Sequence, residues 1–340
     1  MLKKFFIFLI LIVIIGGIYA FKLYQDISTP NVKIQDSPLL YVNTESTLDD
    51  VLISLMNENQ LIDTSSFLWV AQLMKFKNPK PGRYRLKADM SNRSLISLLR
   101  SGKQEPLSLT FNNMRTIEEL SGYFGHMLES DSIAFINYFT SKEALDKSGL
   151  DKENILSVFI PNTYEVYWNT SPQNLFAKLF SENEKFWNSE RMAQLETLNL
   201  SKDEVYTLAS IVQKETNLNA EKPTIAGVYL NRLKRGQLLQ ADPTVVFATG
   251  DFGIRRVLNK HIIIDSPYNT YKYEGLPPGP IFMPDVSSID AVLNPEQHSY
   301  LYFCASPDNS GKHQFAKTLI EHNRNANKYR NWLNQRNIYK

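Results

Sequence analysis

Glu215 lies in a sequence context that predicts a carboxyl group able to donate a proton. The capping box Ser201–Glu204 predicts a helix that begins at Val205 and ends near Asn217. At about 100° per residue, three apolar residues before Glu215 fall on its own face of that helix. These residues are Leu208, Ile211 and Val212. We therefore expect Glu215 on the apolar face of its helix, near the C-terminal end.

Both features of this position raise the expected pKa of Glu215. An apolar environment disfavours the carboxylate, and so does the negative end of a helix dipole. A carboxylic acid that stays protonated near neutral pH is what the cleavage of a glycosidic bond requires. Helix geometry alone allows equally an interfacial glutamate that is paired with an arginine or lysine.

Several further motifs follow Glu215 in the chain, and together they resemble the YceG-like family of endolytic murein transglycosylases. The matching segments are Leu208–Thr216, Asn231–Leu233, Gln240 with Asp242–Thr244, Tyr268–Tyr271, Gly275–Pro280, Tyr300–Phe303, His313–Phe315 and Glu321–Asn323. The resemblance implies that Glu215 is the catalytic glutamate. Two positions depart from the family pattern: Gln213 replaces a frequent second glutamate, and Asn162 replaces a frequent aspartate.

The resemblance implies a lytic transglycosylase that cleaves MurNAc-β-1,4-GlcNAc bonds within peptidoglycan strands. Its products would have 1,6-anhydroMurNAc ends, and the reaction would limit the growth of nascent strands. One carboxyl group can act as acid and then as base, so no cofactor is expected. Two alternatives stay open: a hydrolase that uses both Glu215 and Asp242, and a non-catalytic peptidoglycan-binding scaffold of the cell-wall synthesis machinery.

Nine polar or aromatic residues of these motifs are candidates for substrate binding. They are Asn231, Arg232, Gln240, Asp242, Thr244, Tyr268, Asn269, Tyr271 and His313. Each also has a structural interpretation. Asp242 could form an Asx turn before Pro243, and Arg232 could form a structural ion pair instead of binding a substrate carboxylate. The five histidines have no HExxH or other metal-binding spacing, so no metal site is predicted.

The charge balance gives no electrostatic argument for nucleic-acid binding, and the cysteine content excludes a disulfide within the chain. Lys and Arg total 37 against 35 Asp and Glu, for a net charge of +2. That balance gives no basic face for nucleic acid. The single cysteine, Cys304, excludes an intramolecular disulfide.

An uncharged apolar segment from Phe5 to Phe21 follows Lys3 and Lys4. Its length is at the short end of what spans a bilayer, and the lysines favour a cytoplasmic N-terminus. Cleavage after Ala20 would place Ile18 where signal peptidase prefers a small residue, so we expect an uncleaved anchor. The remainder would lie on the periplasmic or extracellular side of the cytoplasmic (inner) membrane. Peptidoglycan strands, the membrane and peptidoglycan synthases are the expected partners.

The whole chain is expected to be α+β. After a transmembrane helix we predict a small LysM-like α/β module, with the order strand, helix, helix, strand, and then a mixed α+β catalytic domain. The expected segments are a cytoplasmic tail (1–4), the anchor (5–22), a linker (23–37), the LysM-like module (38–104), an intermediate region (105–198) and the catalytic domain (199–340).

Overall fold

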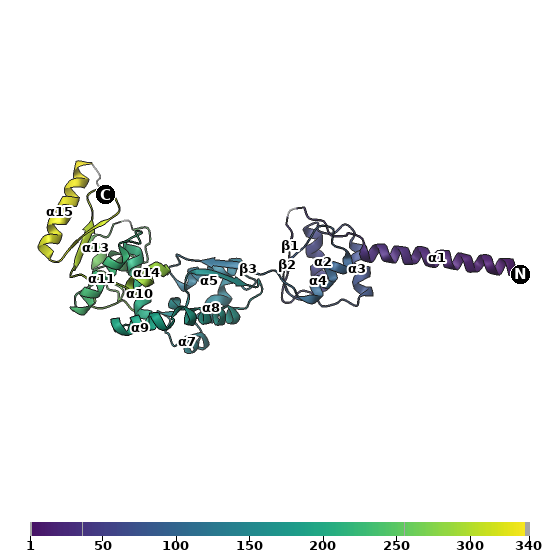
Figure 1. The fold of residues 1–340 in the computed structure, drawn as a ribbon, viewed down its shortest axis with the longest axis horizontal. Coiled ribbons are helices and arrows are strands. Elements are labelled where there is room, and N and C mark those ends of the chain that lie inside the picture. The colour runs from purple at the N-terminus through teal and green to yellow at the C-terminus, as the bar shows by residue number, and fades with distance from the viewer. Residues whose placement is uncertain (1, 36, 255, 337–340) are drawn as a thin grey trace. The chain divides into compact units, whose positions relative to one another are not determined.

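The computed structural model describes residues 2–35, 37–254 and 256–336 and is a mixed α+β fold with an apolar helix at the N-terminus (Figure 1). Residues 1, 36, 255 and 337–340, which belong to the expected tail, linker and catalytic domain, lie outside the described residues. The chain forms two compact units. The first contains the chain up to Leu109 with 127–130 and 165–171, and the second contains 110–126, 131–164 and the chain from Pro172 onward.

Helix α1 (Leu2–Ser28) contains the whole apolar segment and extends beyond it. Within the described residues it is the one helix long and apolar enough to cross a membrane, a conclusion that rests on length and composition alone. Its last turns pack against α3 and α4 of the first unit. The Asn92 side-chain amide donates to the Asp26 carbonyl at 2.9 Å, and Pro30 forms an isolated bridge with Ser91. The first residues of the expected linker are therefore helical and packed.

The first unit contains the predicted order of strand, helix, helix and strand. Its elements are β1 (Leu39–Val42), α2 (Leu48–Asn57), α3 (Thr64–Leu73), β2 (Gly82–Arg85) and α4 (Asn92–Ser101). Strands β1 and β2 are antiparallel, with Leu39 opposite Arg85. Thr47 and Asp50 form a capping box at the start of α2. Gly102 ends α4 in the left-handed conformation (φ 71°), as its glycine type predicts.

A cluster of phenylalanines fills the core of the second unit near its start. Phe124 packs on Phe111, Phe135, Phe139 and Phe159 with ring centroids 5.4–6.3 Å apart. The strands of this part of the chain are β3 (Leu107–Phe111) and β4 (Asn162–Val166), which pair with each other. Its helices are α5 (Ile117–Met127), α6 (Ser132–Phe139), α7 (Lys142–Ser148), the short 3-10 helix η1 (Ile155–Val158), α8 (Pro172–Phe186) and α9 (Ser189–Leu198).

Three helices at the centre of the second unit position Glu215. They are α10 (Lys202–Glu215), α11 (Lys222–Lys234) and α14 (Val286–Leu293), which contact one another (Figure 1). The remaining elements are α12 (Asp242–Thr249), α13 (Asn259–Ile262), the antiparallel pair β5 (Tyr302–Ala305) and β6 (His313–Ala316), and α15 (Leu319–Gln335), which packs on that pair. On α11, a methyl group at Gly227 would lie 2.7 Å from the Glu296 carbonyl oxygen, so only glycine permits this close approach.

Helix α10 begins at the predicted capping box of Ser201 and Glu204 but ends two residues earlier than predicted. Thr216 is extended (φ −146°, ψ 143°), and its hydroxyl accepts a hydrogen bond from the Leu218 amide at 3.0 Å. A threonine hydroxyl that binds a nearby amide competes with helix continuation. Glu215 is therefore the last helical residue, where the chain leaves the helix.

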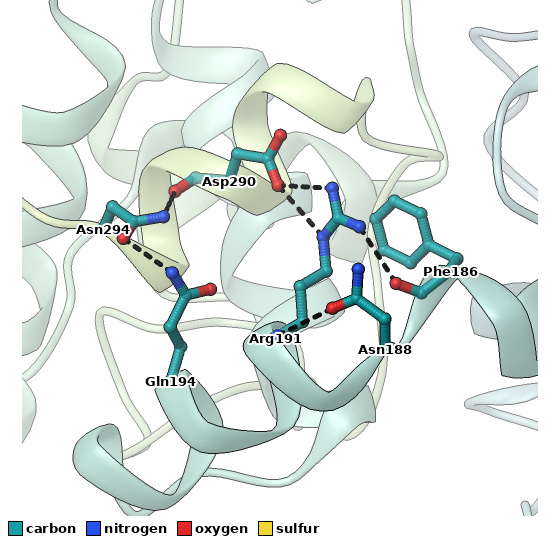
Figure 2. Close-up of polar contacts among 6 residues, drawn as sticks. All are labelled: Phe186, Asn188, Arg191, Gln194, Asp290 and Asn294. Carbon is teal, nitrogen blue, oxygen red and sulfur yellow. Dashed lines mark hydrogen bonds and ion pairs between the residues drawn. The ribbon is translucent and has the colours of Figure 1, made fainter.

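Polar contacts join α9 to α14 (Figure 2). The Arg191 guanidinium donates to Asp290 Oδ1 at 3.1 and 3.2 Å and lies 4.0 Å over the Phe186 ring. Gln194 donates to Asn294 Oδ1 at 2.8 Å. These contacts hold α14, which in turn packs on α10.

Replacing Arg191 by Ala is expected to reduce the free energy of unfolding by about 1 kcal/mol. The ion pair is partly exposed and contributes little, so most of the loss comes from the arginine packed on Phe186. Urea unfolding of the full-length protein in detergent measures the change. The matched control is Glu196→Ala, an exposed position on the same helix, and an equal loss in both variants would contradict the assignment.

Candidate active site

Glu215 is held by a buried tyrosine of the neighbouring helix. The Tyr229 hydroxyl donates to Glu215 Oε1 at 2.5 Å, and the Tyr229 side chain is only 1% exposed. The Tyr229 ring packs edge-on against Phe303 of β5, with centroids 5.9 Å apart. Because one carboxyl oxygen is occupied by this bond, the other oxygen is the one available to a reacting group.

The pKa of Glu215 is raised from its ordinary value of 4.5 to about 7. Burial is the largest cause, and the negative charge of Asp242 raises the pKa further. The Tyr229 hydrogen bond and the positive charge of Arg232 oppose that rise. The expected rise is confirmed. The carboxyl group is thus present in both protonation states near neutral pH, as a group that gives and then takes a proton requires.

Asp242 lies at the start of α12, and its carboxylate is held by a second tyrosine. The Tyr271 hydroxyl donates to Asp242 Oδ1 at 2.6 Å. Burial and this carboxylate both raise the pKa of Tyr271 well above its usual range, so the phenol stays protonated and remains a donor. Each carboxyl group of the site therefore has its own tyrosine.

Two cavities meet at this pair of carboxyl groups, because Glu215 and Asp242 line both of them. The larger cavity has a volume of about 390 Å³ and is also lined by Arg115, Lys214 and several aromatic rings. The smaller cavity has a volume of about 280 Å³ and is lined by Tyr229, Tyr271 and polar residues. Glu215 thus faces open space on two sides.

Five of the residues singled out in the sequence come together at these cavities. They are Glu215, Arg232, Gln240, Asp242 and Tyr271. Gln240 is exposed and has a left-handed backbone conformation (φ 48°), and its backbone N–H donates to the Thr270 carbonyl at 3.0 Å. The direct roles of these residues toward a substrate stay predictions.

The other five predicted substrate-binding residues have partners within the protein and do not line either cavity. Asn231 and Asn269 each donate through the side-chain amide to two backbone carbonyls, at 2.8–3.1 Å. Thr244 contacts the Thr270 hydroxyl at 2.8 Å. The other two are Tyr268, which packs on Phe247 at 4.7 Å, and His313, whose Nδ1 lies 2.9 Å from Glu221 Oε2. Substrate binding by these five stays a prediction.

Arg232 lines the smaller cavity, but most of its hydrogen bonds go to the backbone. Its guanidinium donates to the carbonyls of Leu301 at 2.6 Å, Leu239 at 2.7 Å and Leu238 at 3.4 Å, and its side chain is buried. It therefore joins β5 to the segment before α12. Among the described acidic residues, none forms an ion pair with Arg232, and its binding of a substrate carboxylate stays a prediction.

Several residues at the cavities were not predicted. Tyr229, Tyr302 and His322 line the smaller one, and Arg115, Lys214 and Phe282 line the larger one. In the sequence, an aromatic residue of an apolar helix, such as Tyr229, is indistinguishable from an ordinary core residue. Only its position on the adjoining helix, fourteen residues after Glu215, could have suggested a contact between the two. Across residues 2–35, 37–254 and 256–336, no cluster of three or more His, Cys, Asp or Glu could hold a metal ion.

Gln213, at the position of the family's second glutamate, belongs to a separate buried network. Its Oε1 accepts hydrogen bonds from Lys222, Ser288 and the Asp285 amide at 2.5–3.2 Å, and its Nε2 donates to Asp285 Oδ2 at 3.1 Å. The side chain of Gln213 thus joins α10, α11 and α14 and does not line either cavity.

This fold, and the motifs that build its cavities, define a single family. The chain belongs to the YceG-like family, whose model matches residues 40–328. A crystal structure of a YceG-like protein from Listeria monocytogenes is similar at a TM-score of 0.56 and 26% identity, over 84% of this chain and 97% of that one.

Two curated relatives are named endolytic murein transglycosylase. The Bacillus subtilis (strain 168) protein is 38% identical over 161 residues, which is 47% of this chain and 44% of the relative. The Streptococcus pneumoniae serotype 2 (strain D39) protein is 28% identical over 290 residues, 76% of this chain and 52% of the relative. The chain spans about half the length of the curated relatives it matches.

Proposed function

We propose that this protein is an endolytic peptidoglycan lytic transglycosylase and that Glu215 is its catalytic acid and base. The observation that carries the proposal is the Glu215 carboxyl group itself, whose pKa is raised to about 7 and which lies where two cavities meet. The activity named for the two curated relatives supports it.

In the proposed reaction, protonated Glu215 gives its proton to the glycosidic oxygen between MurNAc and GlcNAc as the C1–O bond breaks. The resulting carboxylate takes the proton of the MurNAc C6 hydroxyl, whose oxygen forms the new bond to C1. The product end is 1,6-anhydroMurNAc, the leaving strand keeps a free hydroxyl, and no water is consumed. Glu215 ends the cycle protonated, so one residue performs both steps.

Asp242 has an electrostatic role in this proposal. Positive charge develops on the sugar ring in an oxocarbenium-like transition state, and a carboxylate beside the same cavities would stabilise it. The Tyr271 hydroxyl fixes the position of Asp242. Space on both sides of Glu215 supports cleavage inside a strand, because sugars must then occupy both sides of the broken bond.

The rest of the chain would bring this site to the cell wall. We propose that α1 anchors the protein in the cytoplasmic membrane with the remainder outside, that 38–104 is a LysM-like module that binds glycan, and that 199–340 is the catalytic domain. Lys3 and Lys4 before the apolar segment support this orientation. Peptidoglycan synthases are the proposed partners, and limiting the growth of nascent strands is the proposed role.

Mass spectrometry of the products tests the function. Full-length protein in detergent is incubated with isolated peptidoglycan and, separately, with nascent strands. Internal fragments that end in 1,6-anhydroMurNAc are the expected result. Products heavier by one water would instead indicate a hydrolase that uses Glu215 and Asp242. Binding without any products from either substrate would leave only the scaffold function.

Replacing Tyr229 by Phe is expected to move the alkaline limit of activity to higher pH. The hydroxyl lowers the pKa of Glu215, so its loss keeps the acid protonated at higher pH. The rate at the optimum should fall about tenfold, because the carboxyl group loses the bond that orients it. The dependence of kcat/KM on pH measures both effects. In the control Tyr123→Phe, whose hydroxyl donates to the Thr110 carbonyl and which lines neither cavity, the profile should stay unchanged.

A further inference from the structure

Three cations line the larger cavity beside Glu215, namely Arg115, Lys214 and Arg256, and the first two each rest on an aromatic ring. The Arg115 guanidinium carbon is 4.6 Å from the centroid of the Phe252 ring, and Lys214 Nζ is 4.4 Å from the centroid of the Phe282 ring. All four side chains line the cavity. The rings limit where each charged group can move, so both charges stay at the cavity wall.

Both charges of this pair, on Arg115 and Lys214, lack an ion-pair partner among the acidic residues within 2–35, 37–254 and 256–336. The carboxyl groups that do line the cavity are Glu215, which carries a proton for part of the time near neutral pH, and Asp242, which accepts a hydrogen bond from Tyr271 and forms no ion pair with either cation. Glu119, close in sequence, accepts a hydrogen bond from the Arg115 backbone amide.

The two cations are also close enough to repel each other. Burial lowers the pKa of Lys214, and the positive charge of Arg115 lowers it further. Holding like charges together in a partly buried place costs free energy unless an anion offsets it. A pair of cations without an ion-pair partner is typical of a site that receives an anion from outside.

The smaller cavity offers no such site. Its cation, Arg232, is already bound to three backbone carbonyls. The two sides of Glu215 therefore differ in charge. A strand that crosses the site is expected to place its anionic substituents on the side of Arg115 and Lys214.

We propose that Arg115 and Lys214 form a subsite for an oxyanion carried by the glycan strand. This proposal rests on the proposed function and adds the part of the substrate that the larger cavity recognises. The oxyanion has two possible sources of the same chemistry: a carboxylate on the lactyl ether or peptide stem of a sugar near the cleaved bond, and a diphosphate at a lipid-linked strand end. The subsite would orient the strand across Glu215.

Binding to catalytically silent full-length protein tests the subsite without relying on cleavage. Glycan fragments are titrated against E215Q and against E215Q with Arg115→Gln, with carboxylates either intact or converted to methyl amides. Loss of one charge-assisted contact should weaken binding of intact strands about tenfold. Strands with methyl amides should bind both proteins equally. Arg115→Lys should restore part of the affinity, and Lys214→Gln should reproduce the loss.

The controls separate the outcomes. Arg235→Gln, which removes an exposed cation of the same chain outside both cavities, should leave binding unchanged. A tenfold loss that persists with methyl amides and disappears when a lipid-linked diphosphate is removed would identify the diphosphate as the ligand. Equal binding of every strand by E215Q with and without Arg115→Gln would overturn the subsite.

The result is also distinguishable from failure of the proposed function. If wild-type protein releases no cleavage products but the Arg115 variant still loses affinity for carboxylate-bearing strands, the subsite stands and the proposed activity fails. If wild-type protein releases anhydro products and Arg115→Gln changes neither binding nor KM, the activity stands and the subsite fails.

Discussion

Replacing Glu215 by Gln is expected to lower the rate of glycan cleavage by roughly 10³-fold, because the variant loses a general acid and a general base at once. Gln keeps the shape of the side chain and still accepts the Tyr229 hydrogen bond, so the variant should fold and bind strands. Quantifying 1,6-anhydro ends over time with matched protein concentrations measures the rate. Activity within tenfold of the wild type would remove Glu215 from the mechanism.

For the same variant we also expect a change in how thermal stability depends on pH. The folded-state pKa of Glu215, about 7, lies above its ordinary value of 4.5. The stabilisation from its protonated form is therefore complete below pH 4.5 and is lost as the pH rises through about 7. Gln does not titrate, so the Tm of the variant relative to wild type should increase from pH 5 to pH 9. A constant difference over that range would contradict the raised pKa.

Replacing Arg232 by Ala is expected to reduce the free energy of unfolding by about 2–4 kcal/mol, because buried carbonyls of Leu239 and Leu301 lose a charged donor. Urea unfolding of the full-length protein in detergent measures the loss. The matched control is Arg235→Ala, which removes an exposed arginine three residues later and should change stability by less than about 0.5 kcal/mol.

This experiment also separates two roles of Arg232. If the guanidinium served mainly to bind a substrate carboxylate, the variant would keep the stability of wild type and lose affinity for glycan. The three carbonyl contacts predict instead that the variant loses more stability than affinity for glycan. Large loss of affinity with unchanged stability would restore the substrate-binding interpretation.

The position of Glu215 was predictable because it depends on local periodicity. Apolar residues at helical spacing place it on the buried face of α10, and burial is the largest cause of its raised pKa. The same spacing allowed equally a glutamate paired with an arginine or lysine, and the structure decides between the two. Tyr229 and the pair of Asp242 and Tyr271 were not predictable in the same way. Their contacts join residues 14 and 29 positions apart, and such distances depend on how helices and loops pack in three dimensions.

The family motifs identified polar residues as important, but they did not distinguish residues that bind substrate from residues that stabilise the fold. An asparagine that binds a sugar and an asparagine that holds two backbone carbonyls are the same residue type. The carbonyl partners of Asn231 and Arg232 lie on a distant segment, at His298 and Leu301, whereas those of Asn269 lie five and seven residues before it in the chain. The loops rich in proline and glycine need such contacts because they have few backbone hydrogen bonds of their own.

In the fold, too, features that depend on neighbouring residues in the sequence were predictable, and features that depend on contacts between distant residues were not. The elements of the first unit follow from caps, apolar spacing and a C-terminal glycine, and their order was predicted. The assignment of 127–130 and 165–171 to that unit was not, because these short segments join it through contacts between residues far apart in the chain, such as Thr44 with Glu129 and Tyr41 with Trp168. The end of α10 at Glu215 depends on one threonine hydroxyl that periodicity does not reveal.

Helix α1 has a mechanical consequence for the first unit. It continues without interruption from the apolar segment to Ser28, where Asn92 and the bridge of Pro30 with Ser91 join it to the folded module. Ser28 lies seven residues after Phe21, which corresponds to about 10 Å of helix. If the apolar segment spans a bilayer as proposed, the module is held close to the membrane surface by a short, continuous helix. Its orientation would follow the tilt of the helix, and the glycan within its reach would be the layer next to the membrane.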